Sequence, residues 1–402
     1  MKYVILQADG MPDHKLPELG NQTPLEVANT PNLDNIAKKA VQFGMVKTIP
    51  DELPPGSDVG NLSVLGYDPR IYYSGRSPLE AASIGVDLKK SDVSLRCNLV
   101  TLTEENGKTI MGDYSAGHIS TEEAREIILD LKEKLEEENL KFFPGVSYRH
   151  LLVWSNGNIN IKTTPPHDIS GKEISGFVPL GEGTDKLNEL IERSKEILRG
   201  HTINKKRLSE GKNPANSIWL WGQGTAPSMP KFKELYGLSG SVISAVDLVK
   251  GIGHYAGLDV INVPGATGYL DTNYEGKVQY ALDSLNRLDL TMIHIESTDE
   301  TGHVGKAELK IQAIEDFDRR VVANVLEGMK RFEEFKILVL SDHPTPIDIR
   351  THVNEPVPFA IYSSKDESIK DSNRVFSEKS ASTTGVFVDE GWKLVGMVLG
   401  KN

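Results

Sequence analysis

Residues 292–303 read MIHIESTDETGH, an apolar run that leads directly into a loop with acidic and histidine side chains. Two other runs have the same form: VILQA is followed by Asp9, and ILVLS is followed by Asp342 and His343. Short apolar runs of this kind predict buried β-strands. Because ligands gather at the carboxyl ends of strands in an open α/β sheet, these loops are expected to meet in one crevice.

The rest of the chain extends this pattern. A strand at Tyr3–Ala8 precedes a helical pattern at Pro24–Ala40, and a long helical pattern covers Ala307–Phe332. Alternating strands and helices predict an α/β fold with a mainly parallel sheet and helices on both faces. The later strands are expected at Ile218–Trp221, Asp259–Val263, Thr291–Ile295, Ile337–Leu340 and Phe359–Tyr362.

The pattern of apolar and charged residues changes between about Ser91 and Ser217. This stretch has charged helical patterns at Thr121–Leu140 and Thr184–Leu198, with a strand pattern at His150–Trp154 between them. Such a change within an alternating chain indicates a separate folding unit. We therefore predict a smaller inserted α+β domain at residues 91–214, and a discontinuous core made of residues 1–90 and 215–402.

Composition limits the partners and the location. The 402 residues carry a formal net charge of −12, which disfavours binding to nucleic acid or to an anionic membrane. The single cysteine excludes an intrachain disulfide, and the first eight residues are too short for a signal peptide. A cytoplasmic protein is expected. Its number of subunits is left open.

Carboxylates and histidines are spaced as metal ligands. Asp299 and His303 are four residues apart, so both can reach one cation from a single helical turn. The adjacent Asp342 and His343 point apart and suit two neighbouring ions, and His352 completes a set of three histidines. Each pair alone is explained as well by helix capping or chance. The joint pattern favours Mn²⁺, Zn²⁺ or Mg²⁺.

A serine lies where a phosphate is often bound. In PPGSDVGNLS, residues 54–63, Ser57 falls between a loop and a predicted helix. Backbone N–H groups at a helix N-terminus can hold a phosphate, although most serines there are simple helix caps. A divalent cation can make such a hydroxyl a strong nucleophile without a histidine base.

These segments resemble a known family along almost the whole chain. The resemblance is to the archaeal-type, 2,3-bisphosphoglycerate-independent phosphoglycerate mutases of the alkaline phosphatase superfamily. It implies an alkaline-phosphatase-like core with an inserted domain and two divalent ions, with Mn²⁺ favoured and Zn²⁺, Co²⁺ or Mg²⁺ also suitable. The segments that carry it are QADG at Asp9, PGSDVGNLSVLGYDP at Ser57, GRSPLEA at Arg76, DYSAGH at Asp113–His118, PPHD at His167, DETGH at Asp299, SDH at Asp342, and His352.

The resemblance also implies roles for individual residues. One ion would be held by Asp299, His303 and His352. The other would be held by Asp9, Ser57, Asp342 and His343, and Ser57 would be phosphorylated during turnover.

Further residues are matched to the substrate. Lys250 resembles the family lysine that contacts the phosphoryl group, although a solvated helix lysine explains it equally well. In the insert, Arg149 suits a carboxylate or phosphate, and His118 suits proton transfer. His167 and Asp168 complete this polar face, and Arg76 or His150 can fill the same need as Arg149.

The leading hypothesis is an isomerase that interconverts 3-phosphoglycerate and 2-phosphoglycerate through phosphoserine at Ser57. A phosphotransferase acting on homoserine is the alternative, because Ser57-Asp-Val-Gly-Asn61 is closer to a bacterial branch that is sometimes proposed to contain homoserine kinases. The sequence has no Walker-type loop for a nucleotide, which disfavours that alternative. A third hypothesis is a non-catalytic metal-binding protein, against which the intact Ser57 argues. The expected partner is a small phosphorylated molecule.

Overall fold

The computed structural model describes residues 1–366 and 373–401. It divides into two compact units: a larger one of Met1–Tyr73 and Ser228–Asn402, and a smaller one of Ser74–Pro227. The predicted insert, residues 91–214, lies inside the smaller unit, which extends further at both ends. Within the described ranges, each helix is too short or too polar to cross a lipid bilayer.

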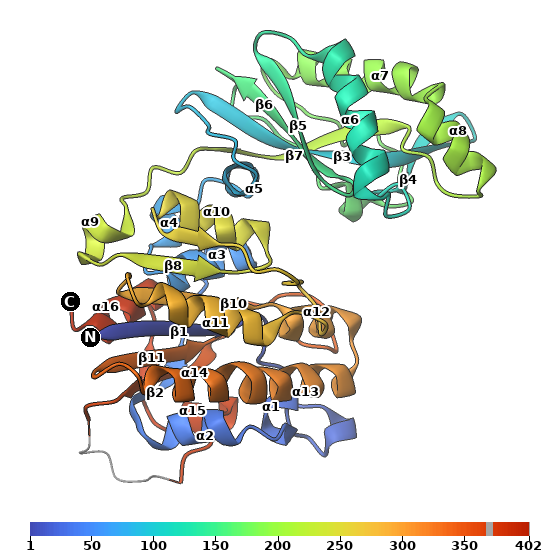
Figure 1. Cartoon of the computed structure of the whole chain (residues 1–402). Coiled ribbons are helices and arrows are strands. Elements are labelled where there is room, and N and C mark those ends of the chain that lie inside the picture. Colours follow the sequence, from blue (N-terminus) through green and yellow to red (C-terminus); the bar gives the residue numbers. More distant parts are fainter. Residues whose placement is uncertain (367–372, 402) are drawn as a thin grey trace. The chain divides into compact units, whose positions relative to one another are not determined.

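The larger unit is built on an eight-stranded sheet with the order β13-β2-β12-β11-β1-β10-β8-β9. Its centre is parallel: β1 lies between β10 and β11, so the start of the chain is enclosed by strands from its last third (Figure 1). The pairs β10–β8, β8–β9 and β13–β2 are also parallel. The predicted α/β class with a mainly parallel sheet is confirmed. The strands are β1 (Lys2–Ala8), β2 (Ala40–Val46), β8 (Gly240–Ile243), β9 (Asp259–Ile261), β10 (Leu290–Ile295), β11 (Phe335–Leu340), β12 (Val357–Ser363) and β13 (Phe387–Val388).

One expected strand departs from the parallel pattern. The run at Phe359–Tyr362 forms part of β12, which pairs antiparallel with both β11 and β2. The apolar composition of a buried strand specifies burial and not direction, so this pairing is not visible in the sequence.

Helices cover both faces of the sheet. Val4 and Leu6 of β1 share a core with Ile36 of α2, Val278 of α11 and Val325 of α14. On the other face, α10 packs against β8 and β9 through buried residues outside this core. Burial on both faces explains why the central strands are almost continuously apolar. The helices of the larger unit are α1 (Pro24–Val27), α2 (Pro31–Lys38), α3 (Ser57–Val64), α4 (Pro69–Tyr72), α9 (Phe232–Tyr236), α10 (Asp247–Tyr255), α11 (Tyr274–Ser284), α12 (Ser297–Val304), α13 (Ala307–Asp316), α14 (Ala323–Met329), α15 (Glu378–Ser382) and α16 (Leu394–Leu399).

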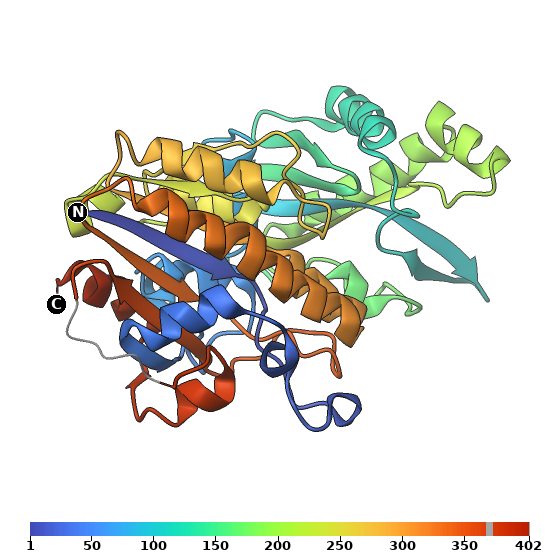
Figure 2. The same ribbon diagram turned by 60° about the horizontal axis from the view of Figure 1, so that its bottom comes forward.

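Two long helical predictions have different outcomes. The pattern at Ala307–Phe332 forms α13 and α14, joined by a π-helical turn at Phe317–Val322, and Figure 2 shows this helix alongside β1. The single helix predicted at Pro24–Ala40 is wrong. The segment is split into α1 and α2, because Pro31 lacks an N–H group and disfavours the helical conformation of the residue before it. Its last residue, Ala40, begins β2.

The smaller unit has an antiparallel sheet centred on the long strand β3. β3 pairs with β4, β6 and β7, and β6 pairs with β5. The helix predicted at Thr121–Leu140 ends at Leu135, because Leu140 begins β5. The elements are β3 (Asp92–Glu105), β4 (Lys108–Asp113), β5 (Leu140–Val146), β6 (Arg149–Ser155), β7 (Ser217–Thr225), α5 (Ser77–Ser83), α6 (Thr121–Leu135), α7 (Thr184–Arg199) and α8 (Thr202–Ser209).

The position of β7 corrects a prediction. The run at Ile218–Trp221 is expected to continue the alternation of the core, but it pairs with β3 in the smaller sheet. Ile218 and Leu220 face a core shared with α6 and α7, whereas Trp219 and Trp221 face a second cluster. Both faces of β7 are therefore filled within the smaller unit.

Candidate metal centre

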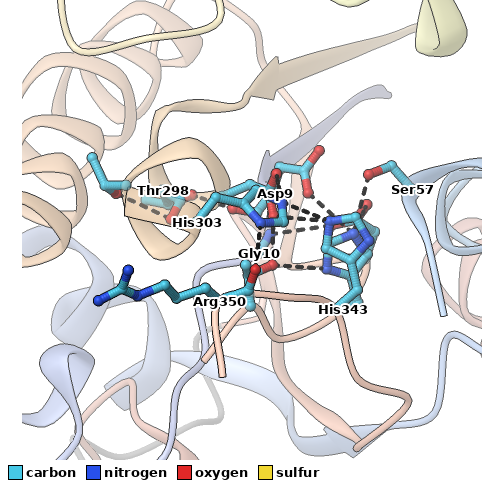
Figure 3. Close-up of polar contacts among 12 residues, drawn as sticks. Asp9, Gly10, Ser57, Thr298, His303, His343 and Arg350 are labelled. Carbon is cyan, nitrogen blue, oxygen red and sulfur yellow. Dashed lines mark hydrogen bonds and ion pairs between the residues drawn. The ribbon is translucent and has the colours of Figure 1, made fainter. Parts of the chain in front are cut away.

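Three neighbouring strands end at the same edge of the larger sheet. Ala8 of β1 pairs with Ile295 of β10, and Gln7 pairs with Leu340 of β11, so the residues that follow these strands emerge close together. Figure 3 shows Asp9, His303 and His343 directed toward one another, with Ser57 on the side of His343. The acidic and histidine side chains that were expected to converge are brought together here.

The first group of side chains surrounds one imidazole nitrogen. His343 Nε2 lies 3.5 Å from Asp9 Oδ1 and 3.4 Å from Asp342 Oδ2. It also lies 3.1 Å from Ser57 Oγ, at the first residue of α3. Asp9, Asp342 and His343 are buried and offer ligand atoms close enough to share one ion.

The second group lies around Asp299. His303 Nε2 is 3.2 Å from Asp299 Oδ2, His352 Nε2 is 3.4 Å from Asp299 Oδ1, and the two imidazole nitrogens are 3.0 Å apart. The rings of His343 and His352 are in contact, with centroids 4.1 Å apart and planes tilted by 34°. Asp299, His343 and His352 also satisfy the spacing of a ligand group. The two groups are therefore contiguous.

The electrostatics of these side chains favour a cation. Burial and the nearby Asp342 raise the pKa of Asp9 well above its ordinary value. The hydrogen bond with Asp299 raises the pKa of His303 to about 9, and burial lowers the pKa of His343. Among the residues that the structure describes, Asp9 Oδ1 is buried without a hydrogen-bond partner. A carboxylate oxygen in this state, among imidazoles and other carboxylates, fits a divalent ion.

Several residues that hold the ligands are not predicted from the sequence. Asn61 Nδ2 donates to Asp342 Oδ2 and to the carbonyl of Ser57, each at 2.9 Å, and the hydroxyl of Thr345 donates to Asp299. His303 Nδ1 lies 2.9 Å from the carbonyl oxygen of Arg350, which leaves Nε2 directed at the centre. Asn61 belongs to a segment that carries the family resemblance, whereas Thr345 and Arg350 are marked in the sequence by their short distance from the predicted ligands.

Gly10 permits the close approach of two loops. Its φ of +62° is strained for other residues, and a Cβ atom there would lie 2.5 Å from Thr345 Oγ1 and 2.6 Å from Asp299 Oδ1. A side chain at this position would displace a candidate ligand. Glycine is therefore required next to Asp9.

Lys250, the predicted phosphoryl contact, lies on α10 of the larger unit. Its ammonium forms an ion pair with Asp247 Oδ1 at 3.6 Å, one helical turn away. Its role stays a prediction.

The smaller unit groups most of the predicted substrate residues. The ring of Tyr114 packs edge-on against His118, Tyr148 and His167, with centroids 6.5, 5.9 and 6.0 Å apart. The guanidinium of Arg149 lies 5.4 Å from the ring of Tyr148. His118, Arg149 and His167 thus belong to one aromatic cluster.

A second basic group adjoins this cluster. Arg76 and Arg96 both pair with Glu80, at 3.2 and 3.0 Å, and Arg96 lies over the ring of Trp221, which packs against His167. Asp168 lies 3.6 Å from His167 and is exposed. Arg96 is not predicted from the sequence, because β3, the strand that carries it, is not recognised there.

Together, the fold and the clustered side chains define a class: α/β proteins with adjoining groups of carboxylate and imidazole side chains that could hold metal ions, at the carboxyl ends of a mainly parallel sheet. Residues 37–204 match the family model described as 2,3-bisphosphoglycerate-independent phosphoglycerate mutase. The chain belongs to that family, because relatives that bear the family's name align with it over their full length.

Those relatives are close in sequence. The chain is 53% identical over 402 residues to the 2,3-bisphosphoglycerate-independent phosphoglycerate mutase of Methanosarcina mazei, covering 99% of this chain and 100% of the relative. It is 51% identical over 399 residues to the probable mutase of the same name from Geobacter sulfurreducens, with the same coverage.

Solved structures agree with the fold. The PH0037 protein from Pyrococcus horikoshii is 30% identical with a TM-score of 0.84, covering 99% of this chain and 96% of that one. The cofactor-independent phosphoglycerate mutase from Thermoplasma acidophilum is 26% identical with a TM-score of 0.67, covering 100% and 99%.

Proposed function

We propose that this protein interconverts 3-phosphoglycerate and 2-phosphoglycerate through a phosphoserine at Ser57. The observation that carries the proposal is the position of Ser57 Oγ, 3.1 Å from His343 Nε2 at the edge of the candidate metal centre. A nucleophile in this place has no use in a purely structural metal site. Relatives at 51 and 53% identity over the full chain bear the mutase name, which supports this substrate over homoserine.

We assign the candidate ligands to two ions as the family resemblance implies. Asp9, Ser57, Asp342 and His343 would hold one divalent ion, and Asp299, His303 and His352 the other. Mn²⁺ is our first choice, and Zn²⁺, Co²⁺ or Mg²⁺ also suit oxygen and imidazole ligands. When bound, such ions lower the pKa of a serine hydroxyl and offset the charge of phosphoryl oxygens.

The chain itself supplies the nucleophile and the groups that stabilise the phosphoryl oxygens. In the first half of the reaction, Ser57 Oγ loses its proton and forms a bond to phosphorus while the bond between phosphorus and the 3-oxygen of glycerate breaks, and the 3-oxygen takes up a proton. In the second half, the 2-oxygen of glycerate loses its proton and attacks phosphorus, the bond between phosphorus and Ser57 Oγ breaks, and Ser57 Oγ takes up a proton. The backbone N–H groups that begin α3 can stabilise the phosphoryl oxygens, and Lys250 is proposed as an additional cation.

The glycerate must be retained between the two halves. We assign this role to the smaller unit, in which His118, Arg149 and His167 share one cluster. Arg149 and Arg76 suit the carboxylate, and His118 is the proposed proton carrier. Asp168 is the proposed partner of His167 during binding. Retention also excludes water, which would otherwise hydrolyse phosphoserine.

The test is a direct assay of the metal-loaded protein. With 3-phosphoglycerate alone it should form 2-phosphoglycerate, whereas with homoserine and ATP it should form no phosphohomoserine. Ser57→Ala should lower the mutase rate by about 10³-fold or more, as loss of a covalent nucleophile does. Ser63→Ala is the matched control, because this serine of the same helix donates to the carbonyl of Thr48 and not toward the centre. Turnover of homoserine, or of neither substrate, would refute the proposal.

A further inference from the structure

His294 is a fully buried histidine that no ligand assignment uses. It lies in β10, within an otherwise apolar run, and its ring is placed between two polar side chains. Nε2 lies 2.8 Å from Asp9 Oδ2, and Nδ1 lies 3.1 Å from Ser244 Oγ. The imidazole therefore connects Asp9 to the loop between β8 and α10.

The direction of both hydrogen bonds follows from the groups involved. A carboxylate that binds a metal ion is ionised and only accepts hydrogen bonds, so in that form of Asp9 the proton lies on His294 Nε2 and is donated to Asp9 Oδ2. At the other end, the backbone N–H of Val246 donates to Ser244 Oγ at 2.9 Å, which leaves the hydroxyl proton free to be donated to Nδ1. Both ends favour the same tautomer, with the proton on Nε2.

The consequence falls on the second oxygen of Asp9. With Oδ2 bound to His294, the carboxylate cannot rotate without breaking a buried hydrogen bond. Oδ1 is then the oxygen that faces His343 Nε2 at 3.5 Å, and this buried oxygen has no hydrogen-bond partner within residues 1–366 and 373–401. The imidazole thus selects which oxygen of Asp9 is directed to the candidate metal centre.

We propose that His294, held by Ser244, is a positioning residue that presents Asp9 Oδ1 to the metal centre. This inference rests on the metal centre of the proposed function and adds a residue to it. The backbone of His294 is also held, since Lys277 Nζ lies 3.3 Å from its carbonyl oxygen. Because Ser244 lies three residues before α10, the same contact fixes the start of the helix that carries Lys250.

A buried histidine whose polar atoms are merely satisfied is the competing explanation. It predicts that changes at His294 alter stability but not the affinity of folded protein for metal. A positioning role predicts that changes at His294 lower the affinity of the folded protein for metal. It also predicts that glutamine, whose amide nitrogen can reach the place of Nε2, will restore the contact with Asp9.

The experiment measures Mn²⁺ binding by calorimetry in the full chain, without phosphoglycerate. His294→Phe keeps the ring shape but removes the donor, and should weaken one of the two Mn²⁺ sites by about 10–100-fold, the usual effect of losing such a supporting contact. Ser244→Ala should weaken the same site by a smaller factor, and His294→Gln should bind more tightly than His294→Phe. Selective ¹⁵N labelling of histidine should show the proton of His294 on Nε2 in the wild-type protein loaded with Zn²⁺, a diamagnetic ion.

His201→Phe is the matched control, because His201 also pairs with a carboxylate, Asp130 Oδ2 at 3.0 Å, but in the smaller unit. It should leave Mn²⁺ affinity unchanged. Wild-type affinity in both His294→Phe and Ser244→Ala, or equal weakening in the Phe and Gln variants, would overturn the inference. If His294→Phe does not fold, Ser244→Ala and the tautomer of His294 decide. A wild-type protein that binds no Mn²⁺ refutes the proposed centre itself, a different outcome.

Discussion

Replacing Lys310 by Met removes a buried cation that connects three segments near the candidate metal centre. Lys310 of α13 and Asp13 are both buried, and Lys310 Nζ lies 2.7 Å from Asp13 Oδ2. The same ammonium donates to the carbonyl oxygens of Pro12 at 3.2 Å and Thr345 at 2.8 Å. Thr345 in turn donates its hydroxyl to Asp299.

The expected loss of stability comes mainly from the carboxylate that is left behind. Breaking a buried ion pair by removing one partner costs about 3–5 kcal/mol, because the remaining charge stays buried without compensation. Asp13 keeps backbone donors from His14 and Ile347, which favours the lower half of that range. We therefore expect Lys310→Met to lower the free energy of unfolding by about 3–4 kcal/mol. Asp13→Asn with Lys310→Met removes the charge as well, and should recover roughly half of the loss.

The assay is urea unfolding followed by circular dichroism, with chelator present so that metal binding does not contribute. Lys336→Met is the control, because Lys336 Nζ donates to a neutral group, the carbonyl of Val398, at 2.7 Å, and the loss of this bond should cost about 1 kcal/mol. A Lys310→Met variant within about 1 kcal/mol of wild type would refute the reasoning. So would a double variant no more stable than the single one.

Three further predictions concern metal, packing and pH. Chelation should abolish mutase activity and Mn²⁺ should restore it, whereas full activity of well-dialysed, metal-free protein would end the two-ion proposal. Gly60→Ala should lower turnover by about 10²-fold, because the added Cβ would lie 2.7 Å from the carbonyl oxygen of Asp342 and must displace α3 or a candidate ligand. The control is Gly176→Ala, which should have no effect because the added Cβ meets no described atom within 4 Å. Equal turnover rates in the two variants would contradict this prediction. Burial raises the pKa of Glu378 to about 7, above that of the unfolded chain, so its stabilising effect is present at low pH and is lost as pH rises through about 7. In urea titrations, the free energy of unfolding of Glu378→Gln should therefore rise relative to wild type as the pH increases from about 4.5 to about 7. A difference between the two proteins that does not change with pH would contradict the raised pKa of Glu378.

The strands at the centre of the fold are predictable because their signal is local. Each is an apolar run that ends in a polar loop, and β1, β10 and β11 are found where the sequence predicts them. Pairing is not local, so neither the placement of β7 beside β3 nor the direction of β12 follows from composition. The break before α2 is different, since Pro31 was a visible signal for it.

The candidate site follows the same rule. Ligands that come directly after strands are identified by position, and the structure brings them together. His294 is not identified, because it reaches Asp9 only through the register in which Gln7 pairs with His294. Arg96 likewise depends on the pairing of β3. The cytoplasmic location, the metal identity and the absence of nucleic-acid or membrane partners rest on composition and ligand chemistry, and stay predictions.

The central claim is that the phosphoryl group is held on the enzyme at Ser57 between the two hydroxyls of glycerate. The most direct measurement is mass spectrometry of wild-type protein mixed with Mn²⁺ and 3-phosphoglycerate and quenched in acid during turnover. The account predicts phosphate on the peptide that contains Ser57, and none on that peptide in Ser57→Ala. Phosphate found only on another residue, in protein that turns over, would contradict it.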